Sequence, residues 1–477
     1  MSTDSLNFPP QDSRPLSSVQ SIPRRYMGRE SWQEALRPWL HELSEGDRRG
    51  LLMANDLLCT GSAASLGIVL TGGTGIFSLL AIWSVLMMGA LYAANQYSLE
   101  PHDERSIGKG IAAVSVGTMT LAWSTSNSAT LPALVTAGCL IFLFMIGSRR
   151  GWTWLFSCRA TRRRVLLLCN GPEAREALSE IRRHPLSGMR ALGMVTERGQ
   201  ASGAPLSLLG EPGQLPLLAN AWKADSIMAG PSAIQSSNWQ QKLTPNEETF
   251  DLPGLFERLS YRIPVRHVDE RWFVEQFTWK RGIGYRIAKR FVDIGFSLFG
   301  LLISVTLLPI VAIANLLDDR GPLFYSQERT GLHGKTFRVY KLRTMRVDAE
   351  KHGAVWAQKN DPRVTRLGNF LRRTRLDELP QLWNVLNGDM SLVGPRPERP
   401  QFVMELEQQI PFYQRRHLVP PGVTGWAQVR FPYGSSVQDS EEKLKFDLYY
   451  AKHRSMVFDL LILLRTISVV LNKTGSR

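Results

Sequence analysis

The chain has 477 residues, of which 44% are hydrophobic, and its 57 basic against 42 acidic side chains give a formal net charge of +15. This length suits roughly three domains of about 150 residues each, and the uneven spread of apolar residues excludes a single globule. The excess of positive charge predicts a polyanionic partner, such as an anionic membrane surface or a phosphorylated substrate. No nucleic acid is expected, because zinc-finger spacing, an RRM signature and a basic zipper are all absent from the sequence.

Residues 1–48 carry Pro, Ser and Arg without a continuous apolar run, which predicts a disordered cytoplasmic tail and no cleavable signal peptide. Residues 49–150 contain four apolar segments near the length needed to cross a bilayer: 51–70, 75–94, 108–124 and 129–147. Basic residues lie between the second and third segments and after the fourth. By the positive-inside rule, we expect four transmembrane helices with both ends of the bundle in the cytoplasm.

Residues 151–281 have the pattern of a soluble α/β module. A buried strand is predicted over 162–171 and an amphipathic helix over 172–184, with further strands at 192–196 and 226–229. This order predicts a small parallel sheet of the Rossmann-like kind. Asn170-Gly171-Pro172 stands where a dinucleotide-binding loop would have its glycine series. We therefore expect a structural or dimerisation module without a bound nucleotide.

The apolar segment from Phe291 to Leu317 is flanked by positive charge on both sides. A simple crossing would put the following basic residues outside the cell, so the charges favour a re-entrant helix, about 290–317, that returns to the side it entered from. Pro309 would supply the break, because proline removes a helical hydrogen bond. An ordinary kinked crossing is the alternative. Residues 282–477 would then form an interfacial catalytic domain, in which Met456–Leu471 lies in the interface or packs on its own domain.

Adjacent carboxylates at Asp377 and Glu378 lie between several arginines. Such a pair can hold a divalent cation while guanidinium groups neutralise the phosphates of a substrate. Pro380 fits the start of a helix that runs to about Asn387 and stops at Gly388, so the pair would lie at a helix N-terminus, where phosphate binds favourably. The alternative is a pair of solvated surface carboxylates, and the surrounding arginines disfavour it.

Two further motifs carry basic residues that could contact phosphate. A β-hairpin turning at 333–335 is predicted between Gln327-Glu-Arg329 and Lys341-Leu-Arg343, and a solvated hairpin is its alternative. The Gly394-Pro-Arg396-Pro397 turn could fix one arginine for bidentate phosphate binding, although such turns are often purely structural.

Six motifs in order resemble the long form of the monotopic phosphoglycosyl transferases, the bacterial polyprenyl-phosphate hexose-1-phosphate transferases that initiate exopolysaccharide or O-antigen synthesis. The motifs are Lys289–Asp293, Pro322–Gly331, Lys341–Met345, Leu376–Pro380, Gly394–Pro397 and Pro421–Gln428. The resemblance implies a multidomain membrane protein with a four-helix transmembrane bundle, the α/β module, and a mixed α/β monotopic catalytic domain with a re-entrant helix.

The resemblance also implies an activity. Hexose-1-phosphate, with galactose or glucose favoured, would pass from a UDP-sugar to undecaprenyl phosphate at the cytoplasmic face of the bacterial inner membrane, with Mg²⁺ bound and UMP released. Asp377 would be the nucleophile and form a covalent phosphosugar intermediate, with Glu378 as its partner and both as metal ligands. The expected substrate-binding residues are Arg372, Arg396, Gln327, Arg329, Lys341 and Arg343.

Two other functions stay open from the sequence. A membrane-bound nucleotide-sugar dehydratase or epimerase would combine a similar bundle with an α/β module, but the incomplete glycine fingerprint disfavours it. A non-catalytic scaffold of polysaccharide assembly would use the same membrane elements, but the retained dyad and arginines disfavour that. The α/β module makes a homodimer plausible.

Overall fold

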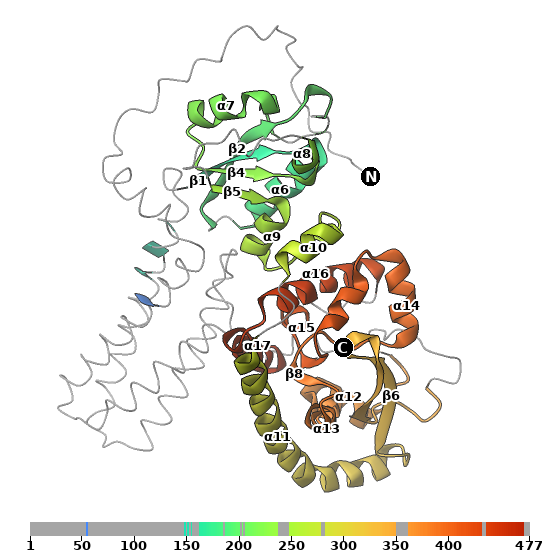
Figure 1. Ribbon diagram of the computed structural model, residues 1–477. Helices are drawn as coiled ribbons and strands as arrows, with labels where there is room; N and C mark the ends of the chain where they lie inside the picture. Colours follow the sequence, from blue (N-terminus) through green and yellow to red (C-terminus); the bar gives the residue numbers. More distant parts are fainter. Residues whose placement is uncertain are drawn as a thin grey trace, which may run out of the picture.

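The computed structural model describes residues 54–55, 147–148, 150–151, 154, 162–184, 187–200, 203, 206–236, 248–277, 282–349, 361–431 and 436–471. The tail expected over 1–48 and almost all of the bundle expected over 49–150 lie outside the described residues, so both stay predictions. Figure 1 shows the two described parts, an α/β module and a larger C-terminal domain that ends in α17.

The α/β module is built on a five-stranded parallel sheet with the order β3-β2-β1-β4-β5. Its strands are β1 (Arg163–Leu168), β2 (Met189–Val195), β3 (Leu208–Gly210), β4 (Ser226–Ala229) and β5 (Glu248–Asp251). Successive side chains of β1 point to opposite faces, so Val165 and Leu167 enter one apolar cluster while Leu166 and Leu168 enter another. The parallel sheet predicted from the sequence is confirmed.

Helices cover both faces of this sheet (Figure 1). They are α6 (Gly171–Arg183), α7 (Leu215–Ala221), α8 (Pro231–Ser236) and α9 (Leu252–Ser260), with short 3₁₀ turns at Arg198–Gln200 and Pro212–Gln214. Residues of α6 and α9 pack into the cluster that contains Val165, and residues of α7 pack into the cluster that contains Leu166. Both faces are therefore buried, which explains why β1 reads as a continuous apolar run.

The start of α6 has a capping box, in which the side chains of Asn170 and Glu173 each accept from the other residue's amide. The Glu173 side chain accepts hydrogen bonds from the Asn170 amide at 3.3 Å, from the Ser232 amide at 3.2 Å and from the Ser232 hydroxyl at 2.7 Å. This crevice, at the carboxyl ends of β1 and β4, is where open parallel sheets bind nucleotide phosphates. A buried carboxylate already accepts from donors in this crevice, and the expectation of a nucleotide-free module stays a prediction.

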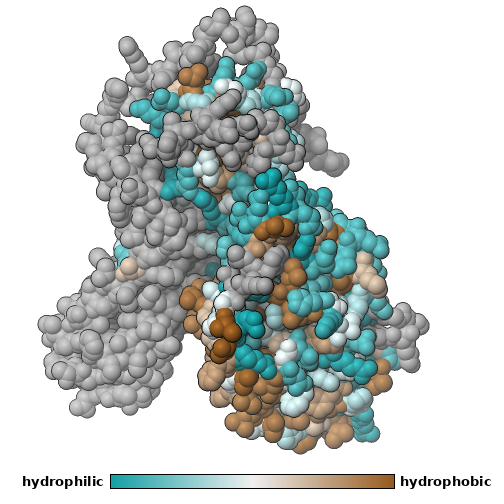
Figure 2. All heavy atoms as spheres, in the orientation of Figure 1, coloured by the Kyte–Doolittle hydropathy of each residue, from teal (hydrophilic) through white to brown (hydrophobic). Residues whose placement is uncertain are grey.

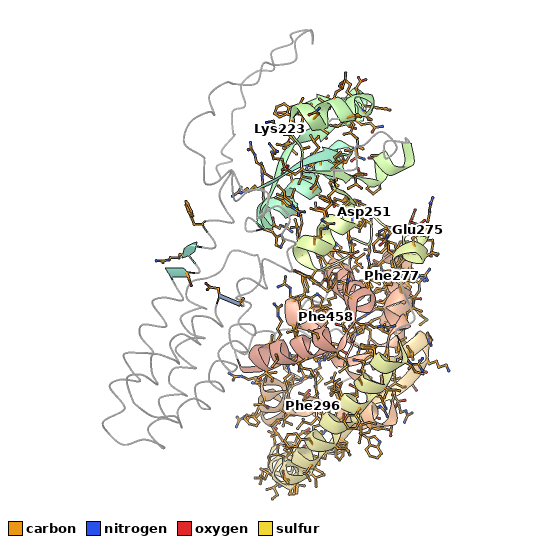
Figure 3. The ribbon with its side chains drawn as sticks, turned by 60° about the vertical axis from the view of Figure 1, so that its left-hand side comes forward. Lys223, Asp251, Glu275, Phe277, Phe296 and Phe458 are labelled. Atoms are coloured by element: carbon orange, nitrogen blue, oxygen red, sulfur yellow. The ribbon has the colours of Figure 1, made fainter. Side chains whose placement is uncertain are left out.

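Residues 261–277 belong to the C-terminal domain by packing, although the sequence pattern predicted an α/β module that extends to 281. Ile263, Val265, Phe273 and Phe277 lie in the same apolar cluster as the core of the C-terminal domain. Figure 3 labels Asp251 and Phe277 on the two sides of this junction. The boundary therefore falls near 260, at the end of α9, and α10 (Glu270–Gln276) packs on the larger domain.

The apolar segment forms one helix, α11 (Ile283–Asp318), of 36 residues with Pro309 inside it. The expected break at Pro309 was wrong, because helical structure continues through it. The helix is bent instead, as Figure 1 shows. Among the described residues it is the one helix long and apolar enough to cross a membrane. Many of its apolar side chains are exposed, including Phe291 at 79% and Leu317 at 83%, and Figure 2 shows hydrophobic residues gathered over this end of the molecule.

The N-terminal part of α11 is bound to the C-terminal domain by buried polar contacts. Lys289 Nζ lies 2.8 Å from Asp459 Oδ2, and the Asp293 carboxylate accepts a hydrogen bond from the Leu392 amide at 3.0 Å. Arg290 donates to the carbonyl oxygens of Val385 and Leu386, which belong to the last turn of α13. The first motif of the resemblance, Lys289–Asp293, is therefore an attachment of the apolar helix.

The opposite end of α11 returns to the same domain. Arg343 donates to Asp319 at 2.6 Å and to Asn315 at 3.1 Å, while the Asp318 carboxylate accepts from the Leu367 amide at 2.9 Å. Both ends of an exposed apolar helix are thus fixed to one folded unit. The structure therefore favours association of this domain with a membrane through α11.

The rest of the C-terminal domain is mixed α/β. Its elements are the antiparallel pair β6 (Phe324–Thr330) and β7 (Thr336–Leu342), the parallel pair β8 (Ser391–Val393) and β9 (Gly422–Thr424), and the helices α12 (Arg366–Thr374), α13 (Gln381–Asn387), α14 (Pro400–Gln409), α15 (Trp426–Arg430), α16 (Val437–His453) and α17 (Met456–Leu471). Short 3₁₀ turns lie at Leu332–Gly334, Leu376–Glu378 and Tyr413–Leu418. The predicted hairpin is confirmed. So is the helix ending at Asn387, where Gly388 has a φ of 89°.

Candidate active site

The two carboxylates lie in the tight connection between α12 and α13. Arg375 ends α12 with a φ of 59°, a left-handed conformation that costs a non-glycine residue about 1 kcal/mol, and the 3₁₀ turn Leu376–Glu378 follows directly. This reversal buries both acids, leaving Asp377 7% and Glu378 9% exposed. The solvated-surface alternative for the pair is therefore excluded.

The Glu378 carboxylate is surrounded by cations. Its Oε1 accepts a hydrogen bond from Arg396 at 2.7 Å and lies 3.5 Å from Lys341 Nζ and 3.9 Å from Arg375 Nη1. Burial alone would raise the pKa of Glu378, but Arg396, Lys341 and Arg375 together hold that pKa well below its usual range. Glu378 is thus a fixed negative charge that gathers three basic side chains.

Asp377 has a different environment from its neighbour, as adjacent residues on a helical turn should. Its Oδ1 is buried and has no hydrogen-bond partner among the described residues. Burial raises the pKa of Asp377, and the charge of Glu378 adds to the effect. An unpaired buried acceptor costs about 1–3 kcal/mol, and together with the raised pKa this makes Asp377 a candidate for a ligand contact or for chemistry.

A cavity of about 610 Å³ surrounds the dyad. All of the residues predicted to form the site line it: Asp377, Glu378, Arg372, Arg396, Gln327, Arg329, Lys341 and Arg343. Apolar side chains form other parts of the wall, among them Phe324, Phe402, Phe431 and Val469. A mostly apolar pocket with a few convergent charged groups is typical of a small-molecule site.

Three of the predicted substrate-binding residues make their hydrogen bonds away from the dyad. Arg329 donates to Gln327 Oε1 at 2.7 Å and to the Pro397 carbonyl at 3.1 Å, so these two side chains support the turn that carries Arg396. The Arg343 guanidinium is held by Asp319, Asn315 and the Pro322 carbonyl at the end of α11. A role of Arg343 in substrate binding stays a prediction, and its contacts favour a role in attaching α11.

Arg372 lies on the dyad side of the cavity. Its Nε donates to Thr344 Oγ1 at 2.9 Å, and its charge works against the rise in the Asp377 pKa. Arg372 and Lys341 therefore remain the residues best placed, with Arg396, to meet a phosphate beside Asp377. Those roles stay predictions.

The predicted Mg²⁺ ligands were Asp377 and Glu378. No group of three or more acidic, His or Cys side chains that could hold a metal occurs within the described part of the chain. Mg²⁺ commonly uses one or two carboxylates together with substrate phosphates, so the unpaired Oδ1 of Asp377 fits this use. Glu378 fits it less well, because its Oε1 is already shared by three cations.

Arg416 and Asp447 are two charged residues of the cavity wall that the sequence did not single out. Both line the cavity and both are buried, at 5% and 2% exposure. One signal was available: Asp447 is an acid within the apolar stretch Phe446–Leu448 of a helix, a position where a charge needs a partner. Its partner, Arg416, lies 31 residues earlier in the chain (447 − 416), so the local sequence pattern does not identify it.

We expect a bell-shaped pH dependence of kcat/KM. Burial lowers the pKa of Lys341 to about 8, so above that pH Lys341 loses its proton and Glu378 loses a cation. On the acid side, the raised pKa of Asp377 makes its carboxylate protonate, and activity fall, at a higher pH than for an ordinary aspartate. In Lys341→Arg the side chain stays charged. Persistence of the alkaline limb in that variant would contradict the assignment to Lys341.

Residues 284–473 match the family described as bacterial sugar transferase. The UDP-N-acetylgalactosamine-undecaprenyl-phosphate N-acetylgalactosaminephosphotransferase of Aeromonas hydrophila is 43% identical over 228 residues, 48% of this chain and 53% of that protein. The UDP-glucose:undecaprenyl-phosphate glucose-1-phosphate transferase of Escherichia coli strain K12 is 42% identical over 184 residues, 38% of this chain and 40% of that protein.

The exopolysaccharide production protein PSS of Rhizobium leguminosarum bv. phaseoli is 42% identical over 187 residues, which are 38% of this chain and 94% of that protein. The chain therefore belongs to the bacterial sugar transferase family, and the family predicted from the six motifs is confirmed. The match spans about half the length of the Aeromonas relative, 53%. The family match at residues 284–473 begins one residue after the start of α11 and leaves out residues 261–277 of the C-terminal domain.

Proposed function

We propose that the protein transfers a sugar-1-phosphate from a UDP-sugar to undecaprenyl phosphate, releasing UMP, as the first membrane step of exopolysaccharide or O-antigen synthesis. The observation that carries this proposal is the buried, unpaired Oδ1 of Asp377 beside a carboxylate that gathers three cations. The names of the relatives support the acceptor and the reaction class, because two of them name undecaprenyl phosphate and a sugar phosphotransferase or sugar-1-phosphate transferase.

The chemistry can be derived from these side chains. Asp377 Oδ1 attacks the phosphorus that carries the sugar, the bond from this phosphorus to the oxygen bridging to UMP breaks, and UMP leaves with that oxygen. A phosphate oxygen of the acceptor lipid then attacks the same phosphorus and releases the Asp377 carboxylate, which gives a lipid diphosphate sugar. Because Arg396 and Lys341 are already fixed by Glu378, they can stabilise charge on the transferring group without reorganising. Mg²⁺, when bound, would neutralise further phosphate charge.

Glu378 has a positioning role in this scheme. Its lowered pKa keeps it ionised throughout the reaction, so it does not take up a proton, and its Oε1 is held by cations. Its negative charge also raises the pKa of Asp377, which makes Asp377 the more basic carboxylate of the pair. The division of labour between the two adjacent acids thus follows from their surroundings.

The proposal includes a re-entrant α11 and a cytoplasmic location of the catalytic domain at the bacterial inner membrane. The helix of 36 residues is bent, and both of its ends are fixed to one domain. This geometry supports entry and return on one side. A reporter fused to the C-terminus and found outside the cell would refute this topology.

The deciding experiment uses purified protein with Mg²⁺, undecaprenyl phosphate and a panel of UDP-sugars. The panel contains UDP-glucose, UDP-galactose and UDP-N-acetylgalactosamine, because the relatives' names differ in the sugar and the sequence does not identify it. Formation of UMP with one of them is expected. Formation of UDP would indicate ordinary glycosyl transfer and would refute the phosphotransferase assignment.

The same preparation tests the two other functions considered. Tightly bound NAD would support a dehydratase or epimerase, although Glu173 occupies the phosphate crevice of the α/β module. Turnover that survives loss of the Asp377 carboxylate would support a scaffold that copurifies with another enzyme. The homodimer through the α/β module is retained as a proposal, for which the oligomeric state in detergent is the measurement.

A further inference from the structure

Residues 394–398 form a strap between β8 and α14 whose main chain is held at every position. Gly394 N donates to Thr424 O at 2.9 Å, and the next four carbonyls of the strap each accept one hydrogen bond. These are Gly422 N to Pro395 O (2.9 Å), Arg416 Nη2 to Arg396 O (2.9 Å), Arg329 Nη1 to Pro397 O (3.1 Å) and Thr330 N to Glu398 O (2.9 Å). The donors to the four strap carbonyls lie in β9, in the 3₁₀ turn Tyr413–Leu418 and in β6. The strap carries Arg396, which contacts Glu378, so the position of the strap determines where this positive charge lies relative to the dyad.

The Arg396 carbonyl is held by a buried charged side chain. Arg416 Nη2 donates to this carbonyl and also lies 2.7 Å from Asp447 Oδ2, while Nη1 donates to Tyr413 Oη at 2.7 Å. Arg416 is 5% exposed and Asp447 is 2% exposed. A continuous chain of contacts therefore runs from Asp447 through Arg416 and Arg396 to Glu378.

Stability alone gives little reason for this ion pair. Removing two charges from water costs much of what their attraction returns, so well-packed apolar residues of similar size often serve a fold equally well. Arg416 is also imperfectly satisfied, because its Nε has no hydrogen-bond partner within the described structure. What an apolar pair could not supply is the hydrogen bond to the Arg396 carbonyl.

The Arg396 side chain, which contacts Glu378, is itself about one-third exposed, at 31%. A long exposed side chain loses conformational entropy when it is held in one geometry. Fixing its main chain from behind reduces the number of positions that the guanidinium can take. A catalytic group must be held within a fraction of an ångström to be effective.

We propose that Arg416 and Asp447 are positioning residues that hold the strap so that the Arg396 guanidinium stays on Glu378 and leaves Asp377 Oδ1 unpaired. This inference rests on the proposed function. It assigns the pair no contact with the reacting atoms. It also predicts that the pair acts only through Arg396.

The test is a charge-free double variant, Arg416→Met with Asp447→Leu, assayed for UMP release at saturating and limiting UDP-sugar. We expect the melting temperature to equal or exceed that of the wild type, because no buried charge is left unpaired. We expect kcat to fall by about 10- to 100-fold, as for residues that orient a site, with KM for the UDP-sugar within about threefold.

A matched control removes another buried pair outside the cavity. Arg262 and Glu180 lie 2.7 Å apart between the α/β module and the C-terminal domain, with side chains 13% and 1% exposed. Arg262→Met with Glu180→Leu should leave kcat at the wild-type value. A loss of kcat equal to that of the test variant would mean that any buried pair matters for folding, and it would overturn the inference.

The decisive readout is a cycle with Arg396→Met. If the pair acts through Arg396, adding Arg416→Met and Asp447→Leu to Arg396→Met should lower kcat no further. Additive losses, or wild-type kcat in the charge-free variant, would overturn the positioning role. Failure of the wild type to release UMP would instead refute the proposed function, so the two failures are distinguishable.

Discussion

Replacing Asp377 by asparagine should reduce UMP release by at least about a thousandfold, because an amide cannot attack phosphorus as a carboxylate does. The variant should fold normally. Asp377 Oδ1 makes no hydrogen bond to the described residues, and neutralising it relieves repulsion from Glu378, so the melting temperature should hold or rise. Turnover and thermal unfolding of the same preparation are the measurements.

The matched control is Asp389→Asn, an exposed carboxylate in the turn that follows α13, which should keep full turnover. Incubation with UDP-sugar in the absence of lipid should add the mass of one sugar phosphate to the wild type and to the control but not to Asp377→Asn. Turnover by Asp377→Asn close to the wild-type level would eliminate the covalent mechanism. A stable adduct on that variant would place the nucleophile elsewhere.

The parts of the site that the sequence predicted are those determined by local chemistry. Pro380 and Gly388 delimit α13 because proline suits the start of a helix and glycine its left-handed end, and α13 runs from Gln381 to Asn387. The hairpin β6–β7 was predicted because its turn residues separate two strand-like runs. In both cases the signal is contained within about twenty consecutive residues.

The parts that the sequence did not predict depend on distant contacts. Pro309 was expected to break α11, but the helix continues through the proline and is bent. Residues 261–277 were assigned to the α/β module, yet Phe273 and Phe277 pack in the core of the C-terminal domain. Periodicity shows which side chains are buried, but it does not show against which domain they pack.

The burial of Asp377 and Glu378 has the same origin. Adjacent acids usually lie on a solvated surface, and here the left-handed Arg375 turns them inward onto Lys341 and Arg396. Lys341 lies in β7 and Arg396 in the strap, so three separate segments meet at one carboxylate. The resemblance to a known family supplied the roles of these residues, and the structure supplies the contacts by which each role could be performed.

Arg396→Met should lower kcat by about 10²- to 10³-fold, the range observed when one preorganised donor to a developing charge is removed. Arg396 is the partner closest to Glu378, at 2.7 Å, and its charge lowers the pKa of both Glu378 and Asp377. Without it both pKa values rise, so more Asp377 is protonated at a given pH. The acid limb of the kcat/KM profile should therefore move to higher pH, and a profile from about pH 5 to 9 measures this shift.

Arg396→Lys separates charge from geometry. Lysine restores a positive charge but not the planar fork of donors, so the acid limb should return toward its wild-type position while kcat stays reduced. The pKa values of the dyad depend on the positive charge near Glu378, which lysine keeps. Stabilisation of the transferring phosphoryl group depends on the direction of the donors, which lysine changes. Recovery of kcat without recovery of the acid limb would contradict this division, and unchanged kinetics in Arg396→Met would exclude Arg396 from the site.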